Sequence, residues 1–140
     1  MANGNYCNTK LDQLIDRCQS GSEIDLSVKQ LTDEDIPIVI EKAIIGKQCT
    51  VLILSQNNIT ANGAAVLADA LRNNTTLIGL SLWDNPIGDA GVQSLIQALT
   101  TNNSVLKRLG LQGNGITDQG AQYLAEMLKT NRTLTALDIQ

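Results

Sequence analysis

The sequence predicts an α/β repeat solenoid, in which short strands and helices alternate along one chain of 140 residues. Three observations lead to this fold class: a repeated pattern, a strand-like alternation within each copy, and a helical spacing behind it. The repeated positions stand 28 or 29 residues apart and are Leu54, Leu82, Leu111 and Ile139; Asn57, Asn85 and Asn114; Ile59, Ile87 and Ile116; and Gly63, Gly91 and Gly120. A period in this range indicates stacked units that share one core.

Each unit is expected to begin with a short strand. Leu80 and Leu82 alternate with Gly79, Ser81 and Trp83, so one face of the strand is buried and the other faces outward. The asparagine three residues after the last leucine can donate to and accept from the backbone of neighbouring units. Stacked copies of Asn57, Asn85 and Asn114 therefore predict a structural asparagine ladder.

A helix is expected to follow each strand. Gly88 and Asp89 begin one, and its apolar positions at helical spacing are Val92, Leu95, Ile96 and Leu99. Thr60 and Thr117 are expected N-caps of the equivalent helices. Leu71, Leu99 and Leu128 are expected to close the units, and asparagine-rich segments at 73–75, 102–104 and 131–133 to end the helices.

These residues resemble a known family. The string Leu77-x-x-Leu80-x-Leu82-x-x-Asn85-x-Ile87-x-x-x-Gly91-x-x-x-Leu95-x-x-x-Leu99 resembles the leucine-rich repeat, and its unit length resembles the ribonuclease-inhibitor-like subclass that also forms NOD-like receptor arrays. The resemblance implies a right-handed α/β horseshoe segment, with a parallel sheet on the concave face and helices on the convex face. It also implies that partner proteins bind the concave face.

One leucine-rich repeat domain is expected to span residues 1–140. Its predicted parts are an N-terminal capping helix at 1–20, a degenerate first repeat at 21–48, regular repeats at 49–76, 77–105 and 106–133, and the start of a fifth repeat at 134–140. Leu11, Leu14, Ile15 and Cys18 stand at helical spacing and suggest the capping helix. Lys29 replaces the ladder asparagine and cannot accept a hydrogen bond, so the ladder is expected to end there.

The two ends of the array are expected to differ. In the first repeat, Thr32 followed by Asp33, Glu34 and Asp35 indicates a helix start, and Pro37 fits only near that start. At 134–140 a fifth strand begins with a free edge, and such an edge can pair with another chain. We therefore expect either a shortened piece of a longer array or a homo-oligomer through this C-terminal edge.

Composition argues against an enzyme. The chain contains no histidine, so neither a Ser-His nor a Cys-His nucleophile can be assembled. Its cysteines have no zinc-site spacing, and Asp33 and Asp35 have a sufficient structural role in a first helical turn. We expect no catalytic residue, no metal and no cofactor.

Charge and hydropathy bound the partners and the location. The net charge is −4, without a basic stripe or interleaved aromatics, so nucleic acid is not an expected partner. An apolar run long enough to cross a membrane is absent, and the opening residues lack a signal-peptide core. Cys7, Cys18 and Cys49 are odd in number, which favours a reducing, cytoplasmic location.

The repeat register predicts which side chains share the outward face of the sheet. The predicted columns are Glu23, Val51, Gly79, Arg108 and Ala136; Asp25, Ile53, Ser81, Gly110 and Asp138; Ser27, Ser55, Trp83, Gln112 and Gln140; and Val28, Gln56, Asp84 and Gly113. From these the candidate partner-binding residues are Val51, Ile53, Ser55, Ser81, Trp83, Asp84, Arg108 and Gln112. Two interpretations of Trp83 are open: it anchors a partner, or it lies across Gly79 or Gly110 and covers backbone.

Three functions fit this surface. The first is a non-enzymatic protein–protein interaction module that binds a partner protein through the concave face. The second is a structural or regulatory segment of a NOD-like receptor-type array that self-associates through its open C-terminal edge. A remote third is a GTPase-activating protein, suggested only by Arg108, the one outward strand arginine.

Overall fold

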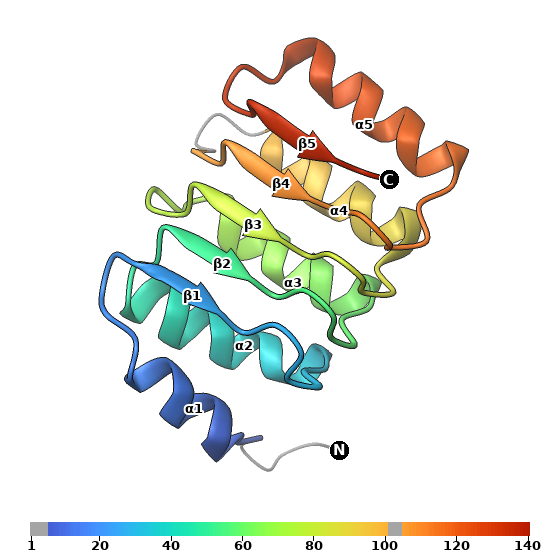
Figure 1. Ribbon diagram of the computed structural model, residues 1–140. Helices are drawn as coiled ribbons and strands as arrows, with labels where there is room; N and C mark the ends of the chain where they lie inside the picture. The colour runs from blue at the N-terminus through green and yellow to red at the C-terminus, as the bar shows by residue number, and fades with distance from the viewer. Residues whose placement is uncertain (1–5, 101–104) are drawn as a thin grey trace.

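The computed structural model describes residues 6–100 and 105–140 and contains a five-stranded parallel sheet backed by helices (Figure 1). The strands lie in chain order: β1 Glu23–Asp25, β2 Val51–Ile53, β3 Gly79–Ser81, β4 Arg108–Gly110 and β5 Ala136–Asp138. The longer helices are α1 Thr9–Asp16, α3 Ala61–Leu71, α4 Gly88–Leu99 and α5 Asp118–Thr130. The predicted α/β solenoid, a parallel sheet with helices on one face, is confirmed.

The strands pair in the register that the repeat predicts. Val51 of β2 lies opposite Gly79 of β3, which lies opposite Arg108 of β4. The middle residue of every strand points to the core, and Leu52 and Leu80 are buried. Successive strand residues point to opposite faces, so the residues on either side form the outward columns.

Helices cover the inner face of the sheet with aliphatic side chains. Leu71 of α3 and Leu99 of α4 are buried as expected, and Thr60 and Thr117 are N-caps whose side-chain oxygens accept from backbone N–H groups. Leu128 of α5 is 47% exposed, against the expectation, because no helix of the described chain packs on its far side. The expected helix end at 102–104 lies outside the described residues.

Neighbouring repeats are also joined where the helices begin. The carboxylate of Asp33 accepts hydrogen bonds from the Thr60 backbone N–H at 2.8 Å and from the Thr60 hydroxyl. Asp89 and Thr117 repeat this contact two units later. The repeated Gly120 makes room for it, since a Cβ there would collide with the Asp89 carboxylate.

The helix of the first repeat is irregular, which the sequence did not predict. It begins as a 3-10 turn at Asp33–Asp35, continues as α2 at Ile36–Val39 and ends as a π-helix at Ile40–Gly46. The helix starts at Thr32 as expected, where Thr32 and Asp35 form a capping box, and Pro37 lies in the first turn of α2. The wider final turns end with Lys47 N–H donating to the carbonyl of Lys42 at 2.9 Å.

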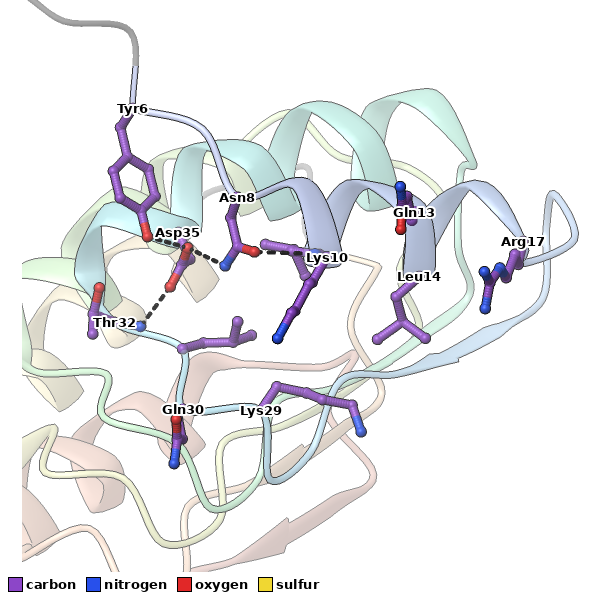
Figure 2. Close-up of a pocket in the computed structure, with 12 residues that line it drawn as sticks. Tyr6, Asn8, Lys10, Gln13, Leu14, Arg17, Lys29, Gln30, Thr32 and Asp35 are labelled. Atoms are coloured by element: carbon purple, nitrogen blue, oxygen red, sulfur yellow. Dashed lines mark hydrogen bonds between the residues drawn. The ribbon is translucent and has the colours of Figure 1, made fainter.

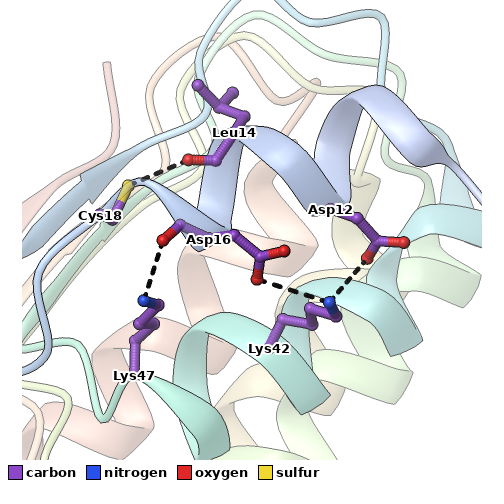
Figure 3. A network of polar contacts seen from close by, with 6 residues as sticks. All are labelled: Asp12, Leu14, Asp16, Cys18, Lys42 and Lys47. Carbon is purple, nitrogen blue, oxygen red and sulfur yellow. Dashed lines mark hydrogen bonds and ion pairs between the residues drawn. The ribbon is translucent and has the colours of Figure 1, made fainter.

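The N-terminal helix α1 covers the first repeat (Figure 3). Leu11 and Ile15 are buried against the core. On the solvent side, Lys42 Nζ lies 3.5 Å from a carboxylate oxygen of both Asp12 and Asp16. Lys47 Nζ also donates to the backbone carbonyl of Asp16 at 3.2 Å. Apolar contacts and polar contacts therefore hold α1 on the same repeat.

The opposite end of the sheet is open. No strand in the described part of the chain pairs with the outer edge of β5. Leu137 is only half-buried, and Ile139 is 40% exposed although it occupies the position of the buried Leu54 and Leu82. The end face therefore presents side chains that other repeats bury.

Candidate functional site

The asparagine row holds the ends of adjacent strands together. Asn57 Nδ2 donates to the carbonyl of Leu54 in its own repeat at 2.9 Å and to that of Leu26 in the preceding repeat at 3.0 Å. Its Oδ1 accepts from the backbone N–H groups of Lys29 and Leu31, both at 3.0 Å. Asn57 thus satisfies the backbone N–H of Lys29. The lysine side chain itself takes no part in the asparagine row, as expected.

The next asparagine repeats this arrangement. Asn85 Nδ2 donates to the carbonyls of Leu54 and Leu82, and its Oδ1 accepts from the Ile59 N–H at 3.1 Å. Both asparagines are almost fully buried, so their amides satisfy backbone groups that water does not reach.

Asn114 departs from the pattern. Its Nδ2 donates to the carbonyl of Leu82 at 3.0 Å, but its Oδ1 is the one buried side-chain polar atom of the described residues without a hydrogen-bond partner. The expected donor, the Ile87 N–H, turns to the carbonyl of Asn85 instead. The intervening Pro86 has no N–H, so this loop cannot follow the path of the equivalent loop at Asn58, whose N–H bonds to the preceding repeat.

A left-handed turn before each ladder position ends the strands. The backbone φ angle is 54° at Val28, 56° at Gln56, 54° at Asp84 and 70° at Gly113. Only glycine adopts this conformation without steric cost, so the three other residues are held there by their surroundings. In four repeats the strand therefore ends at the same position, and the columns of outward side chains end along one edge of the sheet.

Val51, Ile53 and Arg108 meet on the outward face of the sheet. Val51 and Ile53 are half-buried, and Arg108 is exposed. A Cβ on Gly79 would lie 3.4 Å from Val51 Cγ2 and 3.8 Å from Arg108 Nε, so these two side chains flank the bare backbone of Gly79. The column order predicted from the sequence therefore brings an apolar side chain and a guanidinium together over a glycine.

Described residues of this face line a larger and a smaller shallow hollow. The larger encloses about 300 Å³ and is lined by Val51, Ile53, Gly79, Leu80, Ser81, Arg108, Leu109, Gly110 and Asp138. The smaller encloses about 140 Å³ and is lined by Ser81, Trp83, Gly110, Gln112 and Asp138. Three residues, Ser81, Gly110 and Asp138, line both, so the hollows adjoin.

Ser55 is placed differently from the other candidates. Its side chain is only 6% exposed, and its hydroxyl lies 2.8 Å from the hydroxyl of Ser81 on the next strand. Neither hollow includes Ser55. Its hydroxyl is therefore turned to its neighbour and fixes the position of Ser81.

Trp83 stands at the rim of the smaller hollow and is 43% exposed. The atoms nearest to a Cβ placed on Gly110 belong to Ser81, and those nearest to one on Gly79 belong to Val51 and Arg108. The indole is therefore not the side chain closest to either glycine.

Asp84, next to Trp83, is exposed but lines neither hollow. Its carboxylate lies over Gly113, where any Cβ would collide with it.

Charges surround the apolar centre. Asp25 accepts from the Ser27 hydroxyl at 2.6 Å and the Ser27 N–H at 2.9 Å, and these hydrogen bonds hold the pKa of its carboxyl below the ordinary value. Arg108 and Asp138 take part in none of the ion pairs of the described residues. Both are exposed, so their charges are available on this face.

Comparison with known proteins places this architecture in a family. Residues 50–68, 73–95 and 102–125 match the family model described as Leucine Rich repeat. The chain is a leucine-rich repeat protein of the ribonuclease-inhibitor-like type.

Its curated relatives are longer repeat proteins. Human NACHT, LRR and PYD domains-containing protein 5 is 32% identical over 95 residues, which is 66% of this chain and 8% of the relative. The ribonuclease inhibitor of Sus scrofa is 35% identical over 80 residues, or 56% of this chain and 17% of the inhibitor, and that of Mus musculus is 34% identical over 80 residues. The chain thus spans less than a fifth of the length of these relatives.

A solved structure shows the same fold. The structure titled Leiomodin-1 Actin-Binding Site 2 (ABS2) superposes with a TM-score of 0.78, at 22% sequence identity, over 94% of this chain and 78% of the other. At this identity the likeness concerns the fold alone.

Two residues that line both hollows of this leucine-rich repeat surface were not among the candidates. Asp138 and Gly110 line both hollows, although they were recognised only as members of a column. The signal that would have identified them is their register, since each stands beside Ser81 across one or two strands. Candidates chosen by the chemistry of their side chains do not include a glycine, even where its backbone forms the floor of a hollow.

The described residues offer few groups for other chemistry. They contain no group of three or more Cys, Asp or Glu side chains placed to hold a metal ion. Burial raises the pKa of the Cys49 thiol to about 11, which keeps it protonated and unreactive near neutral pH. None of the helices described is both long and apolar enough to cross a membrane.

Proposed function

We propose that this leucine-rich repeat chain is a non-enzymatic module that binds a partner protein through its concave face. The observation that carries the proposal is the pair of adjoining hollows, which combine apolar side chains, a glycine floor and an exposed tryptophan. Trp83 is the proposed anchor, with Val51, Ile53, Ser81, Arg108 and Gln112 around it.

The chemistry of this face supports the proposal. Binding hot spots are enriched in tryptophan and arginine and lie in pockets that lose their water on binding. Gly79 and Gly110 let a partner approach the sheet closely, while Arg108 and Asp138 supply opposite charges at the rim. Ser55 contributes through its hydrogen bond to Ser81, and Asp84 extends the rim beyond Trp83. Two curated relatives are named ribonuclease inhibitor, and an inhibitor of an enzyme acts by binding it.

Location and domain organisation are part of the same proposal. The three cysteines are free thiols, of which Cys49 is buried, and this supports a reducing, cytoplasmic setting. The chain is proposed to act as one domain across 1–140, because a repeat array has one continuous core.

Replacing Trp83 by Ala tests the site directly. Quantitative affinity purification with the parent chain and Trp83→Ala selects proteins that depend on the indole, and calorimetric titration then measures their affinity. We expect a loss of at least about 2 kcal/mol in binding free energy for a true partner.

Val66→Ala is the matched control. Val66 lies on α3 on the convex side and is 42% exposed, close to the 43% of Trp83. Its truncation should leave the affinity unchanged. A partner whose affinity ignores Trp83→Ala but falls with Val66→Ala would move the binding surface to the helices.

One observation favours the second candidate function, a segment of a NOD-like receptor-type array that associates through its C-terminal edge. Leu128 and Ile139 expose 47% and 40% of their surface at the open end beside β5. Apolar side chains next to an unpaired strand edge favour association with another chain.

A further inference from the structure

A separate pocket lies at the N-terminal end of the array, away from the concave face. It encloses about 540 Å³ between α1 and the loop of residues 29–32 that follows β1. Figure 2 shows Lys10, Leu14 and Arg17 projecting from α1 toward the loop that carries Lys29 and Gln30. The pocket is larger than either hollow of the concave face.

The pocket has an apolar floor and basic edges. Leu11 and Leu31 are buried beneath it, and Leu14 is half-buried. Lys10, Leu14 and Arg17 stand at i, i+4 and i+7, so they share one face of α1. A cation therefore stands on either side of an apolar side chain along the helix, and Lys29 faces them from the loop.

The cations of this pocket are unusual in so acidic a region. Residues 1–70 contain nine acidic and five basic residues. Two of the five bases, Lys42 and Lys47, bind Asp12 and Asp16 on another side of α1. The remaining three are Lys10, Arg17 and Lys29, all of which line the pocket and form no ion pair within 6–100 and 105–140.

The one carboxylate that lines the pocket already accepts three hydrogen bonds. Asp35 is 2% exposed and accepts from the Tyr6 hydroxyl at 2.8 Å, the Asn8 Nδ2 at 2.9 Å and the Thr32 N–H at 2.8 Å. The Asp35 carboxylate is therefore bonded to neighbouring polar groups and forms no ion pair with Lys10, Arg17 or Lys29. Asp25, on the sheet side of Lys29, is engaged in the same way by Ser27.

We propose that this pocket binds an acidic peptide segment of a partner protein, with an apolar side chain seated between two carboxylates. Lys10 and Arg17 are seven residues apart, which is about 10 Å along a helix. Two carboxylate residues with one residue between them are about 7 Å apart in an extended peptide. The long side chains of Lys10 and Arg17 make up the difference, so both cations can meet carboxylates at this spacing, and an apolar residue of the same segment packs on Leu14.

The surroundings favour a peptide over other anions. An anionic membrane is a broad surface and would be repelled by the nine acidic residues of this half of the chain, whereas a short peptide contacts the pocket alone. A free phosphate would use the cations but gain nothing from the leucine floor. Charge complementarity across the rim would also steer an acidic segment toward the pocket.

Chemical-shift perturbation of the ¹⁵N-labelled full chain tests the proposal. The probe is an acetylated, amidated pentapeptide of sequence Glu-Leu-Glu-Leu-Glu. Its comparison peptides are Gln-Leu-Gln-Leu-Gln, which lacks the charge, and Glu-Gly-Glu-Gly-Glu, which lacks the apolar side chains. We expect saturable shifts at residues 10–17 and 29–32 with the probe, and binding at least about tenfold weaker with either comparison peptide.

Charge-reversed variants separate this pocket from the rest of the surface. Lys10→Glu combined with Lys29→Glu should weaken probe binding by at least about tenfold. Lys107→Glu combined with Lys129→Glu changes the net charge equally and should leave binding unchanged. Both pairs are exposed, and a ¹⁵N spectrum of each variant checks that it is folded.

Several outcomes would overturn the proposal. Absence of saturable shifts, shifts confined to the concave strands, or equal loss in both charge-reversed pairs would each reject it. Binding to phosphatidylserine vesicles or to inorganic phosphate, with none to the probe, would assign the cations to another anion. Trp83→Ala should not alter probe binding, so failure here leaves the concave-face proposal standing on its own test.

Discussion

At the scale of single residues, the asparagine row joins neighbouring repeats through many side-chain hydrogen bonds to the backbone. Asn57 makes five, counting the weaker contact to the Ser55 carbonyl, while Asn114 makes two. Removing a buried amide leaves its backbone partners without water or protein to replace it. The cost of truncation should therefore follow the number of partners left behind.

We predict that Asn57→Ala lowers the free energy of unfolding by about 3 kcal/mol and Asn114→Ala by about 1 kcal/mol. Urea unfolding followed by far-ultraviolet circular dichroism measures both. Asn58→Ala is the control, because this neighbouring side chain is exposed and should change stability little. An equal decrease in the free energy of unfolding for the two variants would contradict this prediction, because it would mean that the hydrogen bonds of Asn114 stabilise the chain as much as those of Asn57.

The contact between Asp89 and Thr117 should depend on pH. The Thr117 hydroxyl and then its N–H donate to the carboxylate, which holds the pKa of Asp89 below the ordinary value of an aspartate. In the unfolded chain the carboxyl of Asp89 has the ordinary pKa of about 3.9, so the unfolded state takes up the proton first as pH falls. The stabilisation is therefore present above about pH 4 and is lost as pH falls through the lower pKa of the folded state.

We predict that the parent chain is more stable than Asp89→Asn at about pH 6, and that this difference in stability becomes smaller as pH falls to about 3. Thermal unfolding across that range, compared within each pH, isolates Asp89 from the other carboxylates. Thr117→Val removes the hydroxyl that is the main cause of the shift, so its profile should resemble that of Asp89→Asn. A gap that stays constant with pH would contradict a lowered pKa.

The candidate site shows how far residue patterns predict a surface. The period of 28 or 29 residues was sufficient to predict the pairing of Val51 with Gly79 and of Gly79 with Arg108, because strand register in a stacked array follows from the repeat. The period says nothing about where a hydroxyl turns, so the burial of Ser55 against Ser81 needed coordinates. The same holds for the glycine-floored hollow at Gly110.

At the scale of elements, α1 determines how the first repeat is closed. Ile15 is fully buried beneath the helix, whereas Lys42 forms its contacts to Asp12 and Asp16 at the surface. Exposed ion pairs contribute little to stability because solvent screens them and their long side chains must be ordered. The apolar face should therefore hold the cap in place.

Ile15→Ala is predicted to destabilise the chain by about 3 kcal/mol and to release α1. Amide hydrogen exchange should then accelerate in residues 9–16 more than in α4. Lys42→Met removes both ion pairs and is expected to leave the unfolding midpoint nearly unchanged. A larger effect from Lys42→Met than from Ile15→Ala would show that polar contacts hold the cap.

Two elements differ from the regular unit for reasons that the repeat pattern does not contain. The first-repeat helix passes through 3-10, α and π segments, although Thr32 and Pro37 correctly marked its start. The loop at Pro86 leaves the path of its neighbours because proline lacks the N–H used at Asn58. Proline was visible in the sequence, but its effect on the distant Asn114 Oδ1 depends on three-dimensional stacking.

At the scale of the whole molecule, the repeats form one core with two unlike ends. The first repeat is closed by α1, whose buried face continues the aliphatic core. At the other end β5 has an unpaired edge beside Leu128 and Ile139. Each repeat contacts mainly its neighbours, so burial at an end depends on what adjoins that end.

This difference predicts self-association through the open end. Sedimentation velocity over a wide concentration range should show the mass rising from monomer to dimer, because a second copy can bury the apolar side chains and pair with β5. Leu128→Lys combined with Ile139→Lys should hold the chain monomeric. Ile45→Lys combined with Val66→Lys adds the same charge to exposed apolar positions of other helices and should leave the association unchanged. A monomer at every concentration would remove the homo-oligomer alternative, and the concave face would then be the surface to test first for partners.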